Sequence, residues 1–110
     1  MLYLTKKVHF SASHTLKSGA FRGHNYVLEV TLLRTPGERG EASFEFEELT
    51  EAIEKKILSQ VNCKHLDEKT AENLVKIFWN NLETAFPKGV LYEIRLQKAE
   101  CETVSYRGEP

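Results

Sequence analysis

The side chains best suited to chemistry lie at the ends of two neighbouring stretches of alternating residues. His14 ends the first stretch, and Arg22 and His24 lie two positions apart in the second. Residues two apart in a strand face the same side of a sheet, so Arg22 and His24 are expected to share a face. An imidazole can ligate a metal or hydrogen-bond, whereas a guanidinium stays protonated and only donates. His14 and His24 are therefore either metal ligands or ordinary histidines of a polar pocket.

The other reactive groups are few. The chain has two cysteines, Cys63 and Cys101, which do not make a disulfide framework, so we expect a reduced, cytoplasmic setting. Cys63 is either a displaced nucleophile or a half-buried thiol that packs like a small apolar residue. Asp67 is the only aspartate in the sequence, so a mechanism that needs an aspartate has a single candidate.

Two strands are expected to position the histidines. Apolar residues alternate with polar ones from Leu2 to Ser13, which is typical of a half-buried strand. Residues 22–33 alternate in the same way, with Arg22, His24 and the apolar even-numbered residues on one parity. A turn around Pro36-Gly37 follows.

The rest of the chain predicts two helices and two more strands. Residues 47–60 have helical spacing, and 62–69 are polar and loop-like. Thr70 is a candidate N-cap, with Glu72 in the first turn of a helix that stops at Pro87. Strands are expected over 90–99 and 103–107, joined by a hairpin tip at 100–102.

This order predicts one α+β domain over residues 1–110. It is a four-stranded antiparallel sheet, strand-strand-helix-helix-strand-strand, with both helices on one face. The other face must be buried or polar, and open edges remain. Edge-to-edge assembly into a ring would cover those edges.

Composition limits the classes of partner that we expect the protein to bind. The 110 residues carry a net charge of −1, so no overall field attracts nucleic acid or an anionic membrane. No apolar run approaches the roughly 20 residues that a membrane span needs. No secretory signal is recognised at the N-terminus.

Four motifs in order resemble the family of 6-pyruvoyl and 6-carboxy tetrahydropterin synthases. They are Phe10-Ser-Ala-Ser-His14, Gly23-His-Asn-Tyr26, Thr70-Ala-Glu-Asn-Leu74, and Val90-Leu-Tyr with the later Tyr106-Arg-Gly-Glu109. The resemblance runs nearly end to end. It implies a tunnelling fold (T-fold) whose subunits form a barrel-shaped ring, as a homo-trimer or homo-hexamer, with active sites between subunits.

The resemblance also implies chemistry. The family binds zinc through three histidines and handles a dihydropterin. Its members eliminate triphosphate from 7,8-dihydroneopterin triphosphate, or remove its side chain on the queuosine route. The positions that match the zinc ligands hold His14, Arg22 and His24, so the third ligand is replaced by a residue that cannot ligate zinc. Cys63, Cys101 or a glutamate would have to complete a metal site.

Other catalytic positions also differ from the family pattern. The loop 15–21 lacks the cysteine that the family often carries there. The family's Leu-Asp-His segment corresponds to Val61-Asn62-Cys63, so the proton-relaying pair is replaced. Cys63 and His65 are the remaining catalytic candidates, with His65 as a substitute for the lost histidine.

The pterin anchor is altered too. The family's glutamate, which accepts the N–H groups of the pterin's amino-pyrimidine edge, corresponds to Lys98, a donor only. Glu100 shares its parity and would replace it after a shift in the hairpin, or both are plain surface charges. The expected substrate-binding residues are Arg22, Lys98, Glu100, Thr70 and Glu72.

Three functions follow from these observations. The first is a tetrahydropterin-synthase-type lyase with a rearranged site, and zinc is its cofactor if another side chain completes the metal site. The second is a catalytically altered relative that binds a pterin, a nucleotide or another planar, phosphate-bearing ligand. The third is a structural subunit of a mixed ring.

Overall fold

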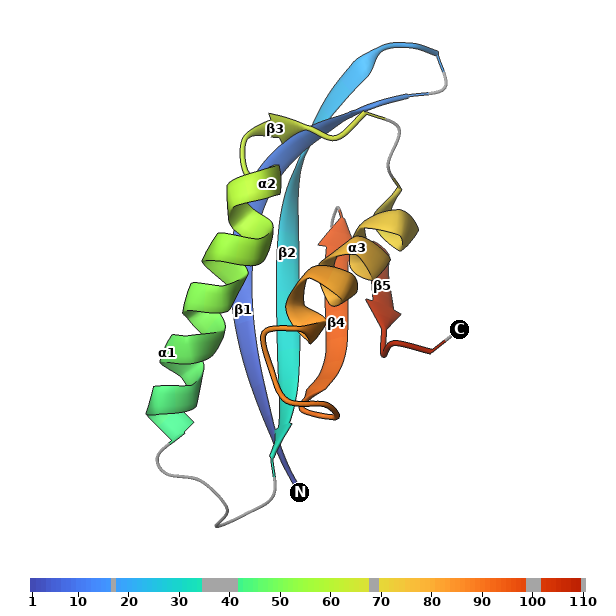
Figure 1. Cartoon of the computed structure of the whole chain (residues 1–110). Coiled ribbons are helices and arrows are strands. Elements are labelled where there is room, and N and C mark those ends of the chain that lie inside the picture. The colour runs from blue at the N-terminus through green and yellow to red at the C-terminus, as the bar shows by residue number, and fades with distance from the viewer. Residues whose placement is uncertain (17, 35–41, 68–69, 99–101, 110) are drawn as a thin grey trace.

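A long β-hairpin organises the fold. The computed structural model describes residues 1–16, 18–34, 42–67, 70–98 and 102–109. The elements are, in order, β1 (Leu2–Thr15), β2 (Phe21–Arg34), α1 (Ala42–Ile53), η1 (Glu54–Leu58), α2 (Ser59–Val61), β3 (Lys64–His65), α3 (Ala71–Glu83), β4 (Leu91–Lys98) and β5 (Glu102–Tyr106). Figure 1 shows both helical segments on one face of the sheet, α1 alongside β1 and α3 in front of β4.

The sheet has five strands in the order β3-β1-β2-β4-β5. The predicted α+β fold, with two main helical segments on one face, is confirmed, but the strand count was one too low. The missing strand is β3, inside the segment predicted to be a loop, and it runs parallel to β1. The backbone N–H groups of Cys63 and Leu66 donate to the carbonyl oxygens of Ser11 and Ser13, both at 2.6 Å. A strand of two residues is too short to show alternation, so no sequence pattern predicts it.

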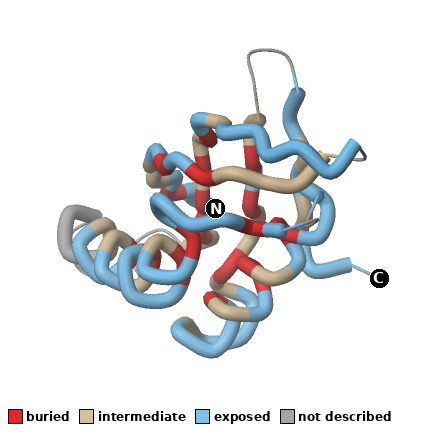
Figure 2. The backbone as a smooth tube through the Cα atoms, turned by 90° about the horizontal axis from the view of Figure 1, so that it is seen from above, coloured by how far each residue is buried: buried red, intermediate tan, exposed pale blue. Residues whose placement is uncertain are grey.

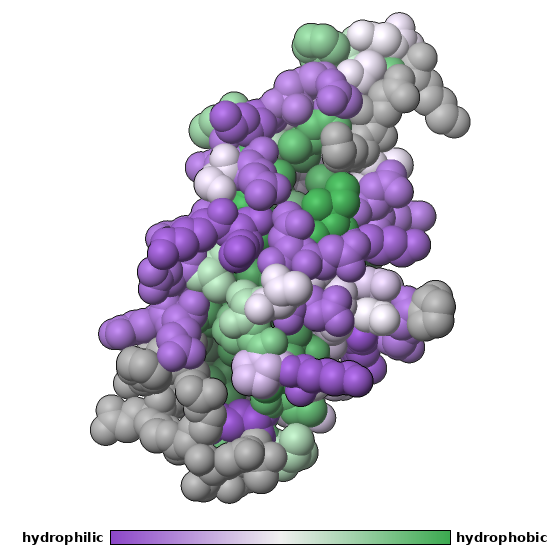
Figure 3. All heavy atoms as spheres, in the orientation of Figure 1, coloured by the Kyte–Doolittle hydropathy of each residue, from purple (hydrophilic) through white to green (hydrophobic). Residues whose placement is uncertain are grey.

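The core lies between the sheet and the helices, as Figure 2 shows. The inward positions of β1 and β2 are the even-numbered ones, as predicted, and Leu28 and Val30 are fully buried there. The helices add a complementary set of apolar residues, namely Leu49, Ile53, Ile57, Val61, Leu74, Val75, Phe78, Trp79 and Leu82. Figure 3 shows apolar atoms in a band between the helical segments, with hydrophilic residues on their outer sides.

The helices differ from the prediction in detail. The first helical segment begins five residues before the predicted start at Glu47 and contains a π-helical turn, η1. Thr70 caps α3 as predicted, because its hydroxyl accepts from the Asn73 N–H at 3.2 Å. No helix among the described residues is long and apolar enough to cross a membrane.

One end of the hairpin projects beyond the rest of the sheet (Figure 1). The β2–β4 pairing runs from Tyr26 to Leu32, so Phe21–Asn25 continue without β4 beside them. On the other side of the hairpin, β3 pairs with only Ala12 and Ser13. We call residues 11–15 and 21–25 the projecting end, and both predicted histidines lie there.

Candidate functional site

His14 and His24 lie together on the inward face of the projecting end. Their rings are stacked, with centroids 4.7 Å apart and planes at 16°. Antiparallel pairing places His14 opposite Arg22 and Ala12 opposite His24, so the two imidazoles are diagonal neighbours across β1 and β2. Arg22, predicted to share their face, is the direct cross-strand neighbour of His14.

Both imidazoles have a nitrogen without a partner. Among the described residues, Nδ1 of His14 and Nε2 of His24 are buried and neither accept nor donate a hydrogen bond. Burial lowers the pKa of both rings, and the charges of Lys98 and Arg22 lower it further. Neutral rings are therefore favoured near pH 7, each with an acceptor nitrogen for a proton or a ligand.

Lys98 brings a second fixed cation to this face. It ends β4 opposite Tyr26 of β2. Its charge lowers the pKa of both histidines more than the charge of Arg22 does. Tyr26 is buried, stacks on Phe10 with ring centroids 4.8 Å apart, and lies edge-on to His24 at 5.9 Å. Burial raises the pKa of the Tyr26 phenol, so Tyr26 is a neutral support beneath the site.

Among the described residues, fewer acidic than basic side chains act on the histidine pair. Glu102 of β5 raises the pKa of His24, which places an acidic group near the cations. Glu100 and Cys101 lie outside the described residues. Glu72 is exposed in the first turn of α3. The Thr70 hydroxyl takes part in the helix cap, where it donates to Asn73 Oδ1 at 2.9 Å.

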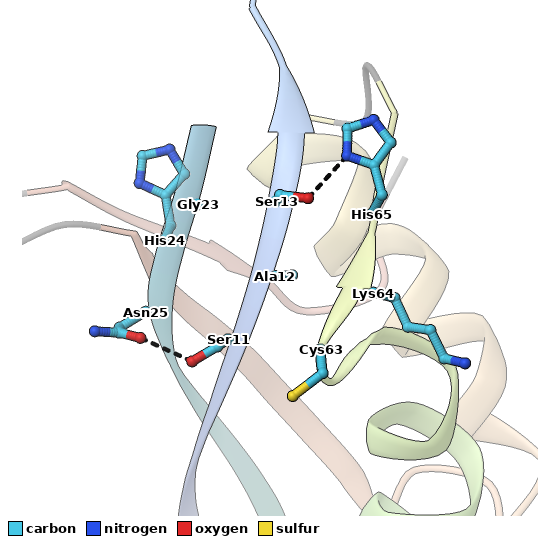
Figure 4. Close-up of a pocket in the computed structure, with 9 residues that line it drawn as sticks. All are labelled: Ser11, Ala12, Ser13, Gly23, His24, Asn25, Cys63, Lys64 and His65. Carbon is cyan, nitrogen blue, oxygen red and sulfur yellow. Dashed lines mark hydrogen bonds between the residues drawn. The ribbon is translucent and has the colours of Figure 1, made fainter. Parts of the chain in front are cut away.

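His65 occupies a different environment, shown in Figure 4. Its Nδ1 is hydrogen-bonded to the Ser13 hydroxyl at 2.8 Å and its Nε2 to the Thr15 hydroxyl at 3.0 Å. Asp67 Oδ1 lies 3.7 Å from the same Nε2, and the Phe21 ring covers the imidazole at 4.3 Å. Both ring nitrogens are therefore used to fasten β3 to β1, which leaves His65 poorly placed to serve as a base.

A hollow of about 520 Å³ lies beside β3 and the projecting end of the hairpin. It is lined by Ser11, Ala12, Ser13, Gly23, His24, Asn25, Cys63, Lys64 and His65. Figure 4 shows the Cys63 thiol pointing from β3 toward β1, while Ser11 donates to Asn25 Oδ1 at 2.8 Å. Cys63 is exposed, not the half-buried thiol considered from the sequence. Its φ of 60° lies in the left-handed region, and its N–H donates to the carbonyl oxygen of Ser11.

The residues present do not fit a three-histidine zinc centre. His14 and His24 offer two free nitrogens, but the third position holds a guanidinium that has no lone pair for a metal. No group of three histidine, cysteine or acidic side chains with metal-binding geometry occurs among the described residues. Cys63 does not complete the pair, and Cys101 and Glu100 are not described. The misfit with a zinc centre therefore comes from the types of side chain present, since one of the three matching positions holds a residue that cannot ligate zinc.

Sequence reasoning missed the groups that hold β3. Ser13, Thr15 and Asn62 had no assigned role, yet the first two bond His65 and the third accepts from the Ser11 N–H at 3.2 Å. Ser13 and Thr15 are odd-numbered residues of β1, so they lie on the opposite sheet face from His14 and His24. This parity was the signal in the sequence that could have separated them from the histidine pair. Their long-range partner was not readable from spacing.

Comparison with known proteins gives the same family as the motifs. The family model described as 6-pyruvoyl tetrahydropterin synthase matches residues 3–109. A 6-pyruvoyl tetrahydrobiopterin synthase of Dictyostelium discoideum is 31% identical, over 96% of this chain and 96% of that protein. The Drosophila melanogaster protein of the same name is 29% identical, over 96% of this chain and 79% of that protein.

A solved structure agrees on the fold. Caenorhabditis elegans 6-pyruvoyl tetrahydropterin synthase superposes with a TM-score of 0.70 at 20% identity, over 98% of this chain and 96% of that chain. The Drosophila alignment runs over 133 positions although this chain has 110 residues, so that relative carries segments that this chain lacks. The matched length and the shared fold together show that the chain belongs to the 6-pyruvoyl tetrahydropterin synthase family.

Proposed function

We propose that this protein is a tetrahydropterin-synthase-type lyase that acts on a dihydropterin triphosphate. One observation carries the proposal beyond family membership. Two stacked imidazoles, each with a buried nitrogen that has no partner among the described residues, share a sheet face with Arg22 and Lys98 where the hairpin extends past the end of β4.

The side chains divide into two roles. Elimination of triphosphate requires a base that removes a proton from the substrate's side chain and donors that receive the departing phosphate oxygens. A neutral His14 or His24 can accept the proton, since their lowered pKa keeps them unprotonated near pH 7. Arg22 and Lys98 can donate to the phosphate oxygens.

A second candidate function is binding without turnover. The observation that favours it is Lys98 at the end of β4, which by the family resemblance corresponds to the pterin-anchoring glutamate and cannot accept the N–H groups of an amino-pyrimidine. In that case the protein is an altered relative that binds a pterin, a nucleotide or another phosphate-bearing ligand. A structural subunit in a mixed ring is the remaining alternative.

Turnover separates these candidates. Purified protein is incubated with 7,8-dihydroneopterin triphosphate, and inorganic triphosphate release is followed by phosphorus NMR. The lyase proposal expects release that is lost in a His14→Gln/His24→Gln double variant. Thermal stabilisation by the substrate without release would identify a binding protein. Neither stabilisation nor release by a folded sample would reject both.

We also propose that the protein assembles into a homo-oligomeric ring through its open edges, in a cytoplasmic setting. Along β1, only Ala12 and Ser13 pair with β3, and β5 is the other edge of the described sheet. Met1, Leu2, Tyr3 and Phe21 are large apolar residues that the single chain leaves exposed. Light scattering coupled to size exclusion gives the stoichiometry, and a trimer or hexamer is expected. A monomer at micromolar concentration would contradict this.

A further inference from the structure

The residue at the third histidine position decides what the site can hold. Arg22 lies opposite His14, is exposed, and has five N–H donors with no acceptor. A dication at the free nitrogens of His14 and His24 would meet this positive charge at close range. The same charge would instead attract the anionic oxygens of a ligand.

We propose that the guanidinium of Arg22 takes the place of a metal ion, so that His14, His24, Arg22 and Lys98 form a metal-independent site for a polyphosphate chain. This inference rests on the proposed function and deepens it, because it names the part of the ligand that the cluster holds.

The chemistry of the four side chains favours phosphate over other ligands. Arg22 and Lys98 are donors at every ordinary pH, so their partner must be an acceptor. A guanidinium matches two phosphate oxygens with two parallel N–H bonds, and a lysine adds a point charge. Among the described residues, Glu102 is the acidic group that acts on His24, and its single carboxylate offsets only part of the charge of the two fixed cations.

The position also allows a chain of phosphates to reach all four groups. His14 and Arg22 are cross-strand partners at one end, and Lys98 lies opposite Tyr26 two residues beyond His24 in β2. Same-face residues two apart in a strand are separated by about 6.5 Å. A single phosphate spans one such step, whereas a triphosphate can follow the row from Arg22 past His24 toward Lys98.

Binding of inorganic tripolyphosphate tests this directly, without any pterin. Calorimetric titration of the whole protein in a chelating buffer is expected to give saturable binding. Arg22→Ala should weaken it by about 10-fold or more, since a charge-assisted, bidentate contact is lost. Arg22→Lys should fall between the two, because it keeps the charge and loses the fork. Arg95→Ala is the matched control, because Arg95 lies in β4 on the opposite face, and its affinity should equal that of the wild type.

A gain of metal binding gives the complementary test. Arg22→His would place three imidazoles on this face, the ligand set that a catalytic zinc requires. After zinc exposure and desalting, this variant should retain about one zinc per chain by mass spectrometry and lose tripolyphosphate affinity in the chelator. The wild type should retain none. Circular dichroism confirms folding, and Arg22→Lys serves as the second probe if the histidine variant misfolds.

The outcomes distinguish this inference from the proposed function. Stoichiometric zinc in the wild type, or tripolyphosphate binding that ignores Arg22, would overturn the metal-independent site even if the protein turns over its substrate. Arg22-dependent binding in chelator with no lyase activity would support the site and reject the lyase.

Discussion

The two halves of the β1–β2 hairpin share one face but have different surroundings. Leu28 and Val30 point inward beneath the helices and are fully buried. Arg22 and His24 have the same parity in the same strand, yet they lie past the end of β4, where Arg22 is exposed and His24 half-buried. Parity fixes the face, and the extent of the covering elements fixes whether that face becomes core or site.

His14 and His24 of the projecting end and His65 of the neighbouring β3 show a similar contrast. His65 spends both ring nitrogens on Ser13 and Thr15, whereas His14 and His24 each keep one nitrogen without a partner among the described residues. Histidine in a motif is therefore not enough to assign chemistry. What separates the two kinds is whether the fold has already used the nitrogen atoms.

The covered half should be the most sensitive to truncation. Leu28→Ala removes a fully buried side chain and leaves a cavity, so it is expected to lower the free energy of unfolding by about 2–5 kcal/mol. Arg22→Ala on the same strand face should change it by less than about 0.5 kcal/mol, because the side chain is exposed. Urea unfolding followed by circular dichroism measures both. Equal losses would refute the division of the hairpin into core and site.

Glycines extend the comparison to the far edge of the sheet. A Cβ on Gly108 would lie 2.5 Å from the Trp79 ring, and its φ of +81° disfavours other residues, so Gly108→Ala should cost about 1–3 kcal/mol. Gly23→Ala in the projecting end is the matched control, since a Cβ added there would meet nothing within 4 Å and its φ is ordinary. It should be neutral within about 0.5 kcal/mol. Thermal unfolding of both variants checks the difference, and a stable Gly108→Ala would remove Trp79 as the constraint.

Variants of His65 and His24 test the contrast between the two kinds of histidine, with smaller expected changes in stability. His65→Ala loses two partly solvated hydrogen bonds, so it should lower the unfolding free energy by about 1 kcal/mol. It should leave tripolyphosphate affinity within about twofold of the wild type, because its nitrogens take no part in the proposed site. His24→Ala should instead weaken tripolyphosphate binding and change the free energy of unfolding little. Urea titration and calorimetry report the two effects, and a large affinity loss in His65→Ala would restore His65 as a site residue.

Much of the fold could be predicted because local and long-range signals agree. Alternation in residues 2–13 and 22–33 gave the correct inward parity, and Thr70 marked the start of α3. The short β3 could not be predicted, because backbone bonds to Ser11 and Ser13 create it and side-chain pattern does not. The left-handed backbone of Cys63, just before β3, could not be predicted either, because a positive φ at a residue other than glycine has no signal in the sequence pattern.

The site was only partly readable for a related reason. Shared parity indicated that Arg22 and His24 share a face, and the pairing of β1 with β2 then brought His14 beside them. The influence of Lys98 depends on the β2–β4 register, which spacing within one strand cannot supply. The hydrogen bonds that occupy both ring nitrogens of His65 also depend on tertiary contacts, whereas the bond of the Thr70 hydroxyl to Asn73 is local to the start of α3.

The smallest expected effect is a pH dependence of stability that comes from the histidine pair. In the folded chain, burial and the charges of Lys98, Arg22 and, for His14, His65 hold the pKa of these rings below 6.5, while Glu102 partly opposes this at His24. The unfolded chain, with ordinary values near 6.5, binds more protons between that pH and the lowered values. Stability therefore rises with pH in this window and is lost as the solution is acidified below about 6.5.

Urea unfolding at intervals between about pH 7.5 and 5.5 measures this slope. The double variant His14→Gln/His24→Gln should flatten it, because both groups that take up protons on unfolding are gone. His9→Gln is the control, as His9 is exposed on the opposite face of β1, and it should leave the slope unchanged. A wild-type protein that gains stability on acidification through this range would mean that the imidazoles are charged in the folded state. The pair would then be an electrostatic clamp on a nearby carboxylate, and the contrast with His65 would lose its physical basis.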